Sequence, residues 1–271
     1  FVVDLATNTP KNVTATIATS FVDSDDDHNV IDPPENPIGW TADSNFLILS
    51  DGWDMWKVAT DGSSATNLTV NGKKLQIRYR ARLRVDADEK GIDLGKTQYI
   101  NWMEEWTKKQ GIGVIAPGAT GVETLVSGDA SFNRLAKARK GDVYIFSKET
   151  VTEPAEVYAT NALLQAPRKL TNLKSEIDAF AWTPGRVLVD FYNDKKDKKN
   201  PKGEKLQGTI YLPAGYEKGK TYPTVVYIYE RLTQSTNNFN RPSVPGTGFN
   251  RAFYTSNGYA VFEPDIKYYI N

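Results

Sequence analysis

The stretch YAVFEPDI, residues 259–266, decides the fold class of the C-terminal part of the chain. Its clustered apolar side chains predict a buried strand, and the Pro-Asp pair predicts where that strand ends. Upstream, NRAFYTSNG at residues 250–258 predicts a short helix that ends at an Asn-Gly pair. Before that helix, TVVYIYE at residues 224–230 is a nearly continuous apolar run. A strand, a helix and a second strand of this kind predict a parallel sheet with both faces covered.

The composition changes between residues 193 and 205, which read NDKKDKKNPKGEK. Lysines mixed with acidic residues and a Pro-Lys-Gly turn favour a solvated loop or linker. A basic patch that binds a polyanion is the alternative, but no aromatic residues are interleaved with these lysines. Beyond the loop, LQGTIYLP at residues 206–213 predicts the strand that opens the C-terminal sheet.

Residues 1 to about 190 have an all-β pattern with an internal repeat. DMWKVAT at residues 54–60 alternates between two faces, as a half-buried strand does, and turn sequences flank it. The same plan returns in GDVYIFSKETVTEPAEVYATNALLQAPRKLT, and the interval from Trp56 to Thr69 equals that from Tyr158 to Thr171. Modules that recur with Leu-Thr closures favour the blades of a β-propeller, and a β-sandwich with repeated turn chemistry is the alternative.

The segment TQYINWMEEWTKKQGIG, residues 97–113, has two interpretations. Tyr99, Trp102 and Trp106 have the spacing of one helical face. A β-hairpin that ends before Gly111 fits the sequence equally well. The two tryptophans could stack on a sugar, but aromatic residues at this spacing more often belong to a core.

The overall composition excludes several classes of function. Thirty-three basic and thirty-three acidic residues cancel, so no global charge favours a nucleic acid or an anionic membrane as partner. No stretch approaches the roughly 18 apolar residues that a membrane span needs. Cysteine is absent, which excludes thiolate nucleophiles and cysteine metal sites. His28, the single histidine, lies in an acidic, proline-flanked loop, a poor place for a general base. We predict no cofactor.

The acidic loop DSDDDHNVID raises the question of a calcium site. Asp23, Asp25 and Asp27 stand at the first, third and fifth positions of a calcium loop. The sixth position is His28 where an EF-hand needs Gly, and the twelfth is Pro34 where it needs Glu, so an EF-hand is excluded. A solvated loop is the preferred interpretation, and a looser oxygen-ligated calcium site is the alternative.

Other candidate catalytic groups have structural explanations. Asp51, Asp54 and Asp61 lie in turns of the repeat, where a short carboxylate satisfies backbone N–H groups. The sequence contains no G-x-S-x-G nucleophile elbow. The residues themselves therefore provide no complete hydrolytic apparatus.

Four motifs in a fixed order carry a resemblance to a known family. LQGTIYLP, KTYPTVVYIYE, SNGYAV and PDI resemble, in that order, the start of the catalytic domain in the prolyl oligopeptidase family of serine peptidases, especially its secreted bacterial dipeptidyl-aminopeptidase-like branch. The resemblance covers most of residues 36–271. It implies a multidomain β plus α/β fold: a partial β-propeller, its last blades, at residues 1–192, a loop or linker at 193–205, and the N-terminal part of an α/β-hydrolase sheet at 206–271.

The resemblance also implies a function for the parent protein. It would be a serine peptidase, periplasmic or secreted, that hydrolyses short peptides through an acyl-enzyme. The family's Ser, Asp and His all follow the strand at 259–266, so they would lie beyond Asn271, and we expect this chain to be an inactive fragment. The alternative is a propeller-like module that binds a peptide or glycan without catalysis.

Two further expectations concern the C-terminal sheet. Tyr229 matches the family's tyrosine that donates its hydroxyl to the oxyanion, although Glu230-Arg231 stands where the family often has Gly-Gly. We therefore take Tyr229 as the candidate oxyanion donor, with a packed strand-end aromatic as the alternative. We also expect a missing C-terminal segment or a partner to cover the sheet edge at 259–266, because an open apolar edge favours aggregation.

Overall fold

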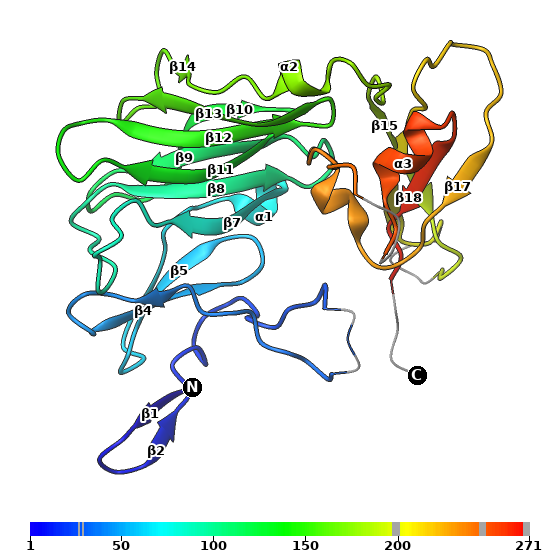
Figure 1. The fold of residues 1–271 in the computed structure, drawn as a ribbon. Coiled ribbons are helices and arrows are strands. Elements are labelled where there is room, and N and C mark those ends of the chain that lie inside the picture. Colours follow the sequence, from blue (N-terminus) through cyan, green and yellow to red (C-terminus); the bar gives the residue numbers. More distant parts are fainter. Residues whose placement is uncertain (27, 29, 197–200, 244–247, 268–271) are drawn as a thin grey trace. The chain divides into compact units, whose positions relative to one another are not determined.

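The computed structural model describes residues 1–26, 28, 30–196, 201–243 and 248–267 (Figure 1). The chain divides into two compact units, each of which is described by itself. The segments of the first unit are Phe1–Gly128, Arg134–Ile145 and Thr160–Pro167. Those of the second are Asp129–Asn133, Phe146–Ala159 and Arg168–Asn271.

The first unit contains two four-stranded antiparallel sheets whose strands follow chain order. The strands of one sheet are β3 (Gly39–Trp40), β4 (Phe46–Ser50), β5 (Met55–Ala59) and β6 (Ala65–Asn67). Those of the other are β7 (Ile77–Leu83), β8 (Gln98–Glu104), β9 (Gln110–Ile115) and β10 (Glu123–Gly128). A short helix, α1 (Gly72–Leu75), connects the two sheets.

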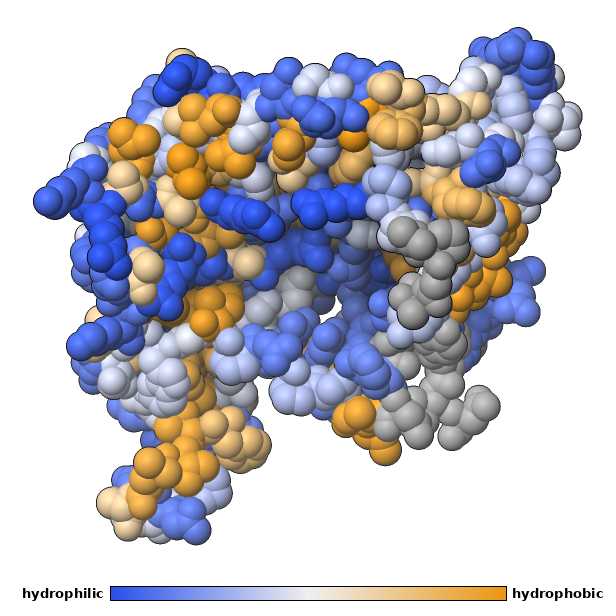
Figure 2. Space-filling model, in the orientation of Figure 1, coloured by the Kyte–Doolittle hydropathy of each residue, from blue (hydrophilic) through white to orange (hydrophobic). Residues whose placement is uncertain are grey.

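An N-terminal hairpin, β1 (Val2–Asp4) and β2 (Thr9–Lys11), precedes these sheets. Its apolar side chains largely face solvent, since Phe1 is 82% and Leu5 94% exposed. Figure 2 shows this hairpin as a projecting apolar region at the lower left. Val2 is the exception, because it packs on the small core of Val13, Leu47 and Val58.

The segment at residues 97–113 lies in the hairpin β8–β9, so the helical interpretation is wrong. The hairpin alternative is confirmed, but the hairpin does not end before Gly111, because β9 continues to Ile115. Trp102 lies opposite Gly111 in the register, and a Cβ added to Gly111 would come within 2.5 Å of the Trp102 ring. Both faces of β8 are largely covered, so its buried residues lack a clear period of two. The indole of Trp102 belongs to the core, together with Ile100 and Ile115.

A third four-stranded sheet comprises β11 (Ser131–Lys137), β12 (Tyr144–Thr150), β13 (Glu153–Thr160) and β14 (Arg168–Lys169), again in chain order. Helix α2 (Lys174–Ile177) follows it. In the sequence, the residues of β13, β14 and α2 repeat the pattern of β5, β6 and α1. The described sheets are open. Only the C-terminal sheet among them departs from chain order.

The C-terminal sheet has the strand order β15-β16-β18-β17. Its strands are β15 (Arg186–Tyr192), β16 (Lys205–Tyr211), β17 (Thr224–Val226) and β18 (Ala260–Pro264). The pairs β15–β16 and β16–β18 are antiparallel, whereas β17 and β18 are parallel. A 3₁₀ turn, η1 (Leu232–Ser235), and helix α3 (Arg251–Ser256) lie in the connection between β17 and β18. The predicted parallel strand pair bridged by a helix is thus confirmed.

Two features of this sheet differ from the expectations. Strand β15 precedes the lysine-rich loop, yet it pairs along its whole length with β16, so the sheet begins at Arg186 and not at residue 206. The predicted edge at 259–266 is also misplaced, because β18 lies between β16 and β17. The edges are β15 and β17. The reason is that β16 pairs with β18, a strand far along the chain, rather than with its neighbour in sequence.

The two faces of the C-terminal sheet differ in chemistry. Val187, Ile210, Phe262 and Val226 pair across the four strands in one row and so project to the same face. Both ends of this row are open to solvent, with Val187 47% and Val226 53% exposed. The opposite face is buried and carries polar side chains, namely Gln207, Thr209, Tyr211 and Glu263.

Helix α3 ends at the Asn-Gly pair that the sequence predicts, and Asn250 caps its other end. The side chain of Asn250 accepts a hydrogen bond from the N–H of Phe253 at 3.0 Å and so begins the helix. At the other end, Gly258 has a φ of 86°, which favours glycine after a helix.

Candidate functional site

The carboxyl ends of the parallel strands β17 and β18 form the candidate site of the second unit. In open α/β sheets, ligands bind in the crevice outside such strand ends. The chain leaving β17 carries Tyr229, the predicted oxyanion donor, and the chain leaving β18 carries Asp265. The sequence analysis did not select Asp265, although its place directly after an apolar strand was the available signal.

Hydrogen bonds fix the segment that contains Tyr229 to the end of β18. The N–H of Tyr227 donates to the Phe262 carbonyl at 2.9 Å, and the N–H of Ile266 donates to the Glu230 carbonyl at 3.4 Å. Tyr229 lies between these two connections. Tyr229 is 58% exposed, and its phenolic hydroxyl is a hydrogen-bond donor.

The carboxylate of Asp265 fixes the following turn. Its Oδ1 accepts from the N–H of Thr233 at 2.8 Å, and its Oδ2 accepts from the Thr233 hydroxyl at 2.5 Å. Asp265 is 3% and Thr233 0% exposed. A buried carboxylate is stable only when donors satisfy it, and Thr233 supplies two of them.

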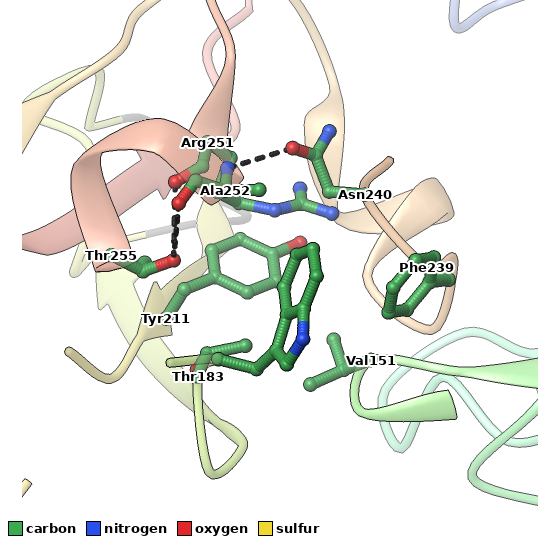
Figure 3. Close-up of a pocket in the computed structure, with 9 residues that line it drawn as sticks. Val151, Thr183, Tyr211, Phe239, Asn240, Arg251, Ala252 and Thr255 are labelled. Atoms are coloured by element: carbon green, nitrogen blue, oxygen red, sulfur yellow. Dashed lines mark hydrogen bonds between the residues drawn. The ribbon is translucent and has the colours of Figure 1, made fainter. Parts of the chain in front are cut away.

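A buried charged cluster lies on the polar face of the same sheet, and Figure 3 shows two of its members, Arg251 and Tyr211. Arg251 from α3 donates to Glu263 of β18 at 3.0 Å, and both side chains are at most 10% exposed. The guanidinium also covers the ring of Tyr211 at 3.7 Å. Burial raises the pKa of Glu263, and the charge of Arg251 opposes that shift. Burial likewise raises the pKa of Tyr211, so Tyr211 is a neutral phenol at neutral pH.

The cavity beside this cluster is small. Figure 3 shows the ring of Tyr211 between Arg251 and Thr183, with Phe239 and Val151 on the far side. The cavity volume is about 10 Å³, which is close to the space of a single water molecule. The Arg251–Tyr211 cluster is therefore part of the packing of this unit and leaves no room for a peptide.

The described residues of the acidic loop make ion-pair and local contacts. Among the described residues, no group of three or more His, Asp or Glu side chains could hold a metal ion. Asp25 forms an ion pair with Arg78 at 2.8 Å. Burial and neighbouring carboxylates raise the pKa of Glu35 in the same region. Asp27 lies outside the described residues, and Asp23 accepts a local bond from the N–H of Asp25 at 3.0 Å.

The remaining sequence candidates have structural roles. Asp51 accepts from the N–H of Asp54 at 2.7 Å, and Asp61 accepts from the N–H of Ser63 at 2.9 Å, which confirms both as turn residues. The indole of Trp106 donates to Gln76 at 3.2 Å. The side chain of His28 is 77% exposed beside Asp26, far from the arrangement of a buried general base.

The sequence matches no known family model, and no curated protein matches it. Solved structures, in contrast, share its fold. Dipeptidyl peptidase 4 of Porphyromonas gingivalis has a TM-score of 0.56 at 14% identity, covering 84% of this chain and 30% of that one. An acylaminoacyl peptidase of Pyrococcus horikoshii has a TM-score of 0.52 at 15% identity, covering 86% of this chain and 33% of that one.

The chain is similar in fold to peptidases. An acylaminoacyl peptidase in complex with Z-Gly-Gly-Phe-chloromethyl ketone is a further match, with a TM-score of 0.53 at 15% identity, covering 87% of this chain and 33% of that one. These are proteins of the prolyl oligopeptidase family, and at such identities the likeness is one of fold. This chain spans about a third of their length. In the part that the structure describes, no helix is long and apolar enough to cross a membrane.

Proposed function

We propose that this chain is part of a serine peptidase of the prolyl oligopeptidase type. In this proposal the three sheets of β3–β14 are successive blades from the end of a β-propeller. The sheet β15-β16-β18-β17 is then the start of an α/β-hydrolase domain. The observation that carries the proposal is the parallel pair β17–β18, joined through α3 and preceded by two antiparallel strands. The fold likeness to peptidases over about a third of their length supports it.

The reaction assigned to the complete protein is hydrolysis of a short peptide through an acyl-enzyme. An activated serine attacks the peptide carbonyl, and negative charge develops on the carbonyl oxygen. Tyr229, at the carboxyl end of β17, is the group of this chain that donates a hydrogen bond to that oxygen. Loss of one such donor typically lowers kcat by about 10²–10³-fold. The nucleophile, the acid and the histidine are assigned to sequence after β18.

The chain alone is therefore proposed to be inactive. Its sequence holds no G-x-S-x-G motif, and its single histidine, His28, lies in the exposed acidic loop.

The open apolar row with Val187 and Val226 at its ends supports a second part of the proposal. Further sequence or a partner covers this face and the β17 edge in the complete protein, because parallel sheets are normally covered on both faces. A periplasmic or secreted location is proposed from the family resemblance.

Chromogenic dipeptide substrates test the proposal. The complete protein that contains residues 1–271 should hydrolyse them, and the isolated chain should not. Tyr229→Phe in the complete protein should lower kcat by about 10²-fold or more. Tyr259→Phe is the matched control, because Tyr259 is also a partly exposed tyrosine but lies directly before β18, at the opposite end of that strand from Asp265. A complete, folded protein without peptidase activity would contradict the proposal.

One observation favours a second function, peptide or glycan binding without catalysis. A hollow of about 570 Å³ in the first unit is lined by Arg82, Glu89 and Lys137 and by the aromatic rings of Tyr99 and Tyr144. Tyr99 and Tyr144 are largely buried, so the charged side chains provide most of the exposed lining. The size of the hollow suits a short peptide or an oligosaccharide. Calorimetric titration of the 1–271 chain with dipeptides and with oligosaccharides tests this function, and heats no larger than dilution would exclude it.

A further inference from the structure

Asp265 and Tyr229 are connected through a short, well-bonded path in the second unit. The chain runs from Tyr229 through a bend into η1, and Thr233 is the second residue of that turn. Both hydrogen-bond donors of Thr233, its N–H and its hydroxyl, point to the two carboxylate oxygens of Asp265. The carboxylate therefore holds the backbone four residues after Tyr229, and not only a side chain.

Two backbone hydrogen bonds also hold this segment. They join Tyr227 to Phe262 on one side of Tyr229 and Glu230 to Ile266 on the other. The Glu230–Ile266 bond is long, at 3.4 Å, so the charged bond of Asp265 is the stronger constraint after Tyr229.

We infer that Asp265 is a positioning residue for Tyr229. By accepting both donors of Thr233, it fixes the Tyr229–Thr233 segment against the end of β18 and so sets where the Tyr229 hydroxyl lies. The role of Asp265 in catalysis rests on the proposed function, in which Tyr229 donates to the oxyanion. Position matters there, because a displacement of about 1 Å at a reacting group can cost about 10²-fold in rate.

Thr236 provides a matched control for Thr233. Both threonines are 0% exposed, and both belong to the same turn, Thr236 at its C-cap. The Thr236 hydroxyl instead bonds the hydroxyl of Thr209 in the centre of β16, at 2.9 Å. Replacing either threonine by valine removes one buried hydroxyl contact, but Thr233→Val alone disturbs the connection to Asp265.

The first experiment uses the 1–271 chain and does not depend on catalysis. Fluorotyrosine is incorporated, and the ¹⁹F resonance of Tyr229 is assigned by its loss in Tyr229→Phe. Thr233→Val and Asp265→Asn are expected to shift or broaden this resonance, and Thr236→Val is expected to leave it in place. An unchanged Tyr229 resonance in folded Thr233→Val and Asp265→Asn would overturn the inference, as would an equal change in Thr236→Val.

The second experiment is a double-mutant cycle in the complete protein. Thr233→Val should lower kcat about tenfold with KM unchanged when Tyr229 is present. In the Tyr229→Phe background the same change should cost less than about twofold, because the group that it positions is gone. Equal losses in both backgrounds would overturn the inference. If Tyr229→Phe itself leaves kcat unchanged, the proposed oxyanion role fails, and the ¹⁹F experiment alone decides whether Asp265 positions the segment.

Discussion

The hydroxyl of Thr69 donates to the carboxylate of Asp54 at 2.7 Å, and the hydroxyl of Thr171 donates to Glu156 in the same way. In each pair the threonine follows the acid by 15 residues. Each threonine oxygen also accepts from the backbone N–H directly after the acid, at 3.0 Å in both cases.

Each acid also accepts a backbone hydrogen bond that completes the repeat. Asp54 accepts from the N–H of Gly72, and Glu156 accepts from the N–H of Lys174, in each case 18 residues after the acid and at the start of a short helix. We call this arrangement the acid–threonine clasp. It ties the third strand of a sheet to the chain that leaves the fourth strand. The equal spacing in the sequence therefore has an atomic cause.

Removal of the threonine hydroxyl should weaken either clasp. Thr69→Val and Thr171→Val leave a buried carboxylate short of one donor, so each should lower the free energy of unfolding by about 1–3 kcal/mol. The two clasps share no residue, and their effects should add. Urea denaturation of both single variants and the double variant measures this. Thr124→Val, at an exposed position of β10, is the control and should change stability by less than about 0.5 kcal/mol.

The clasp of Glu156 should also appear in the pH dependence of stability. Burial raises its pKa, but bonds from Thr171, Lys174 and Leu173 together lower it to about 2, from a model-peptide value of 4.5. The folded state thus binds fewer protons than the unfolded chain between these values. The contribution of Glu156 is present above the unfolded pKa near 4.5 and is lost as pH falls toward 2.

Glu156→Gln should therefore make the free energy of unfolding less dependent on pH below pH 4.5. The free energy of unfolding is measured by denaturant titration between pH 7 and pH 2 for both proteins. The difference between them should be largest above pH 4.5 and should shrink on acidification. A constant difference over the whole range would show that Glu156 does not titrate as its contacts require.

The ion pair of Arg251 and Glu263 predicts an asymmetric mutational result. Arg251→Met leaves the Glu263 carboxylate buried without its cation, which should cost about 3–5 kcal/mol of stability. Replacing both partners, with Arg251→Met and Glu263→Leu, should recover most of the loss, because no buried charge remains. Thermal unfolding of the three variants measures the effect, and a double variant as unstable as the single one would contradict it.

For Tyr211, in contrast, we expect that loss of the polar group alone has little effect on stability. Its hydroxyl is buried, and in the described residues it has no hydrogen-bond partner at normal distance. Tyr211→Phe keeps the ring beneath Arg251 and removes only that hydroxyl, so stability should change by less than about 1 kcal/mol or increase. Tyr211→Leu, which also removes the ring, should cost more than Tyr211→Phe. The same thermal unfolding assay compares the two, and a large loss in Tyr211→Phe would show that the hydroxyl is bonded.

The C-terminal fold could be predicted from sequence where the signal is local. The apolar runs at 224–230 and 259–266, with a capped helix between them, specify a parallel pair and its connection. The strand order could not be predicted, because the pairing of β16 with β18 joins segments far apart in the chain. For the same reason, the sequence did not show that β15, which precedes the lysine-rich loop, belongs to the C-terminal sheet.

Local patterns also failed where both sides of a strand are covered. In β8 the aromatic spacing fitted a helix because buried residues occupy both faces, so periodicity carried little information. The candidate site could be predicted from the sequence only in part. Tyr229 was found through a family motif, whereas Asp265 and Thr233 form a pair that only the folded chain brings together. A charged residue inside an apolar run, such as Glu263 in YAVFEPDI, was a usable signal for a buried pair, although it did not identify Arg251.

Labelling with a serine-directed phosphonate tests the central claim most directly, namely that β15–β18 open a catalytic sheet whose nucleophile follows β18. The 1–271 chain and the complete protein that contains it are treated in parallel; intact mass counts the adducts, and peptide mapping locates them. The account predicts one covalent adduct on the complete protein, at a serine after residue 271, and none on the shorter chain. Labelling of the 1–271 chain, or a folded complete protein that takes no label, would contradict it.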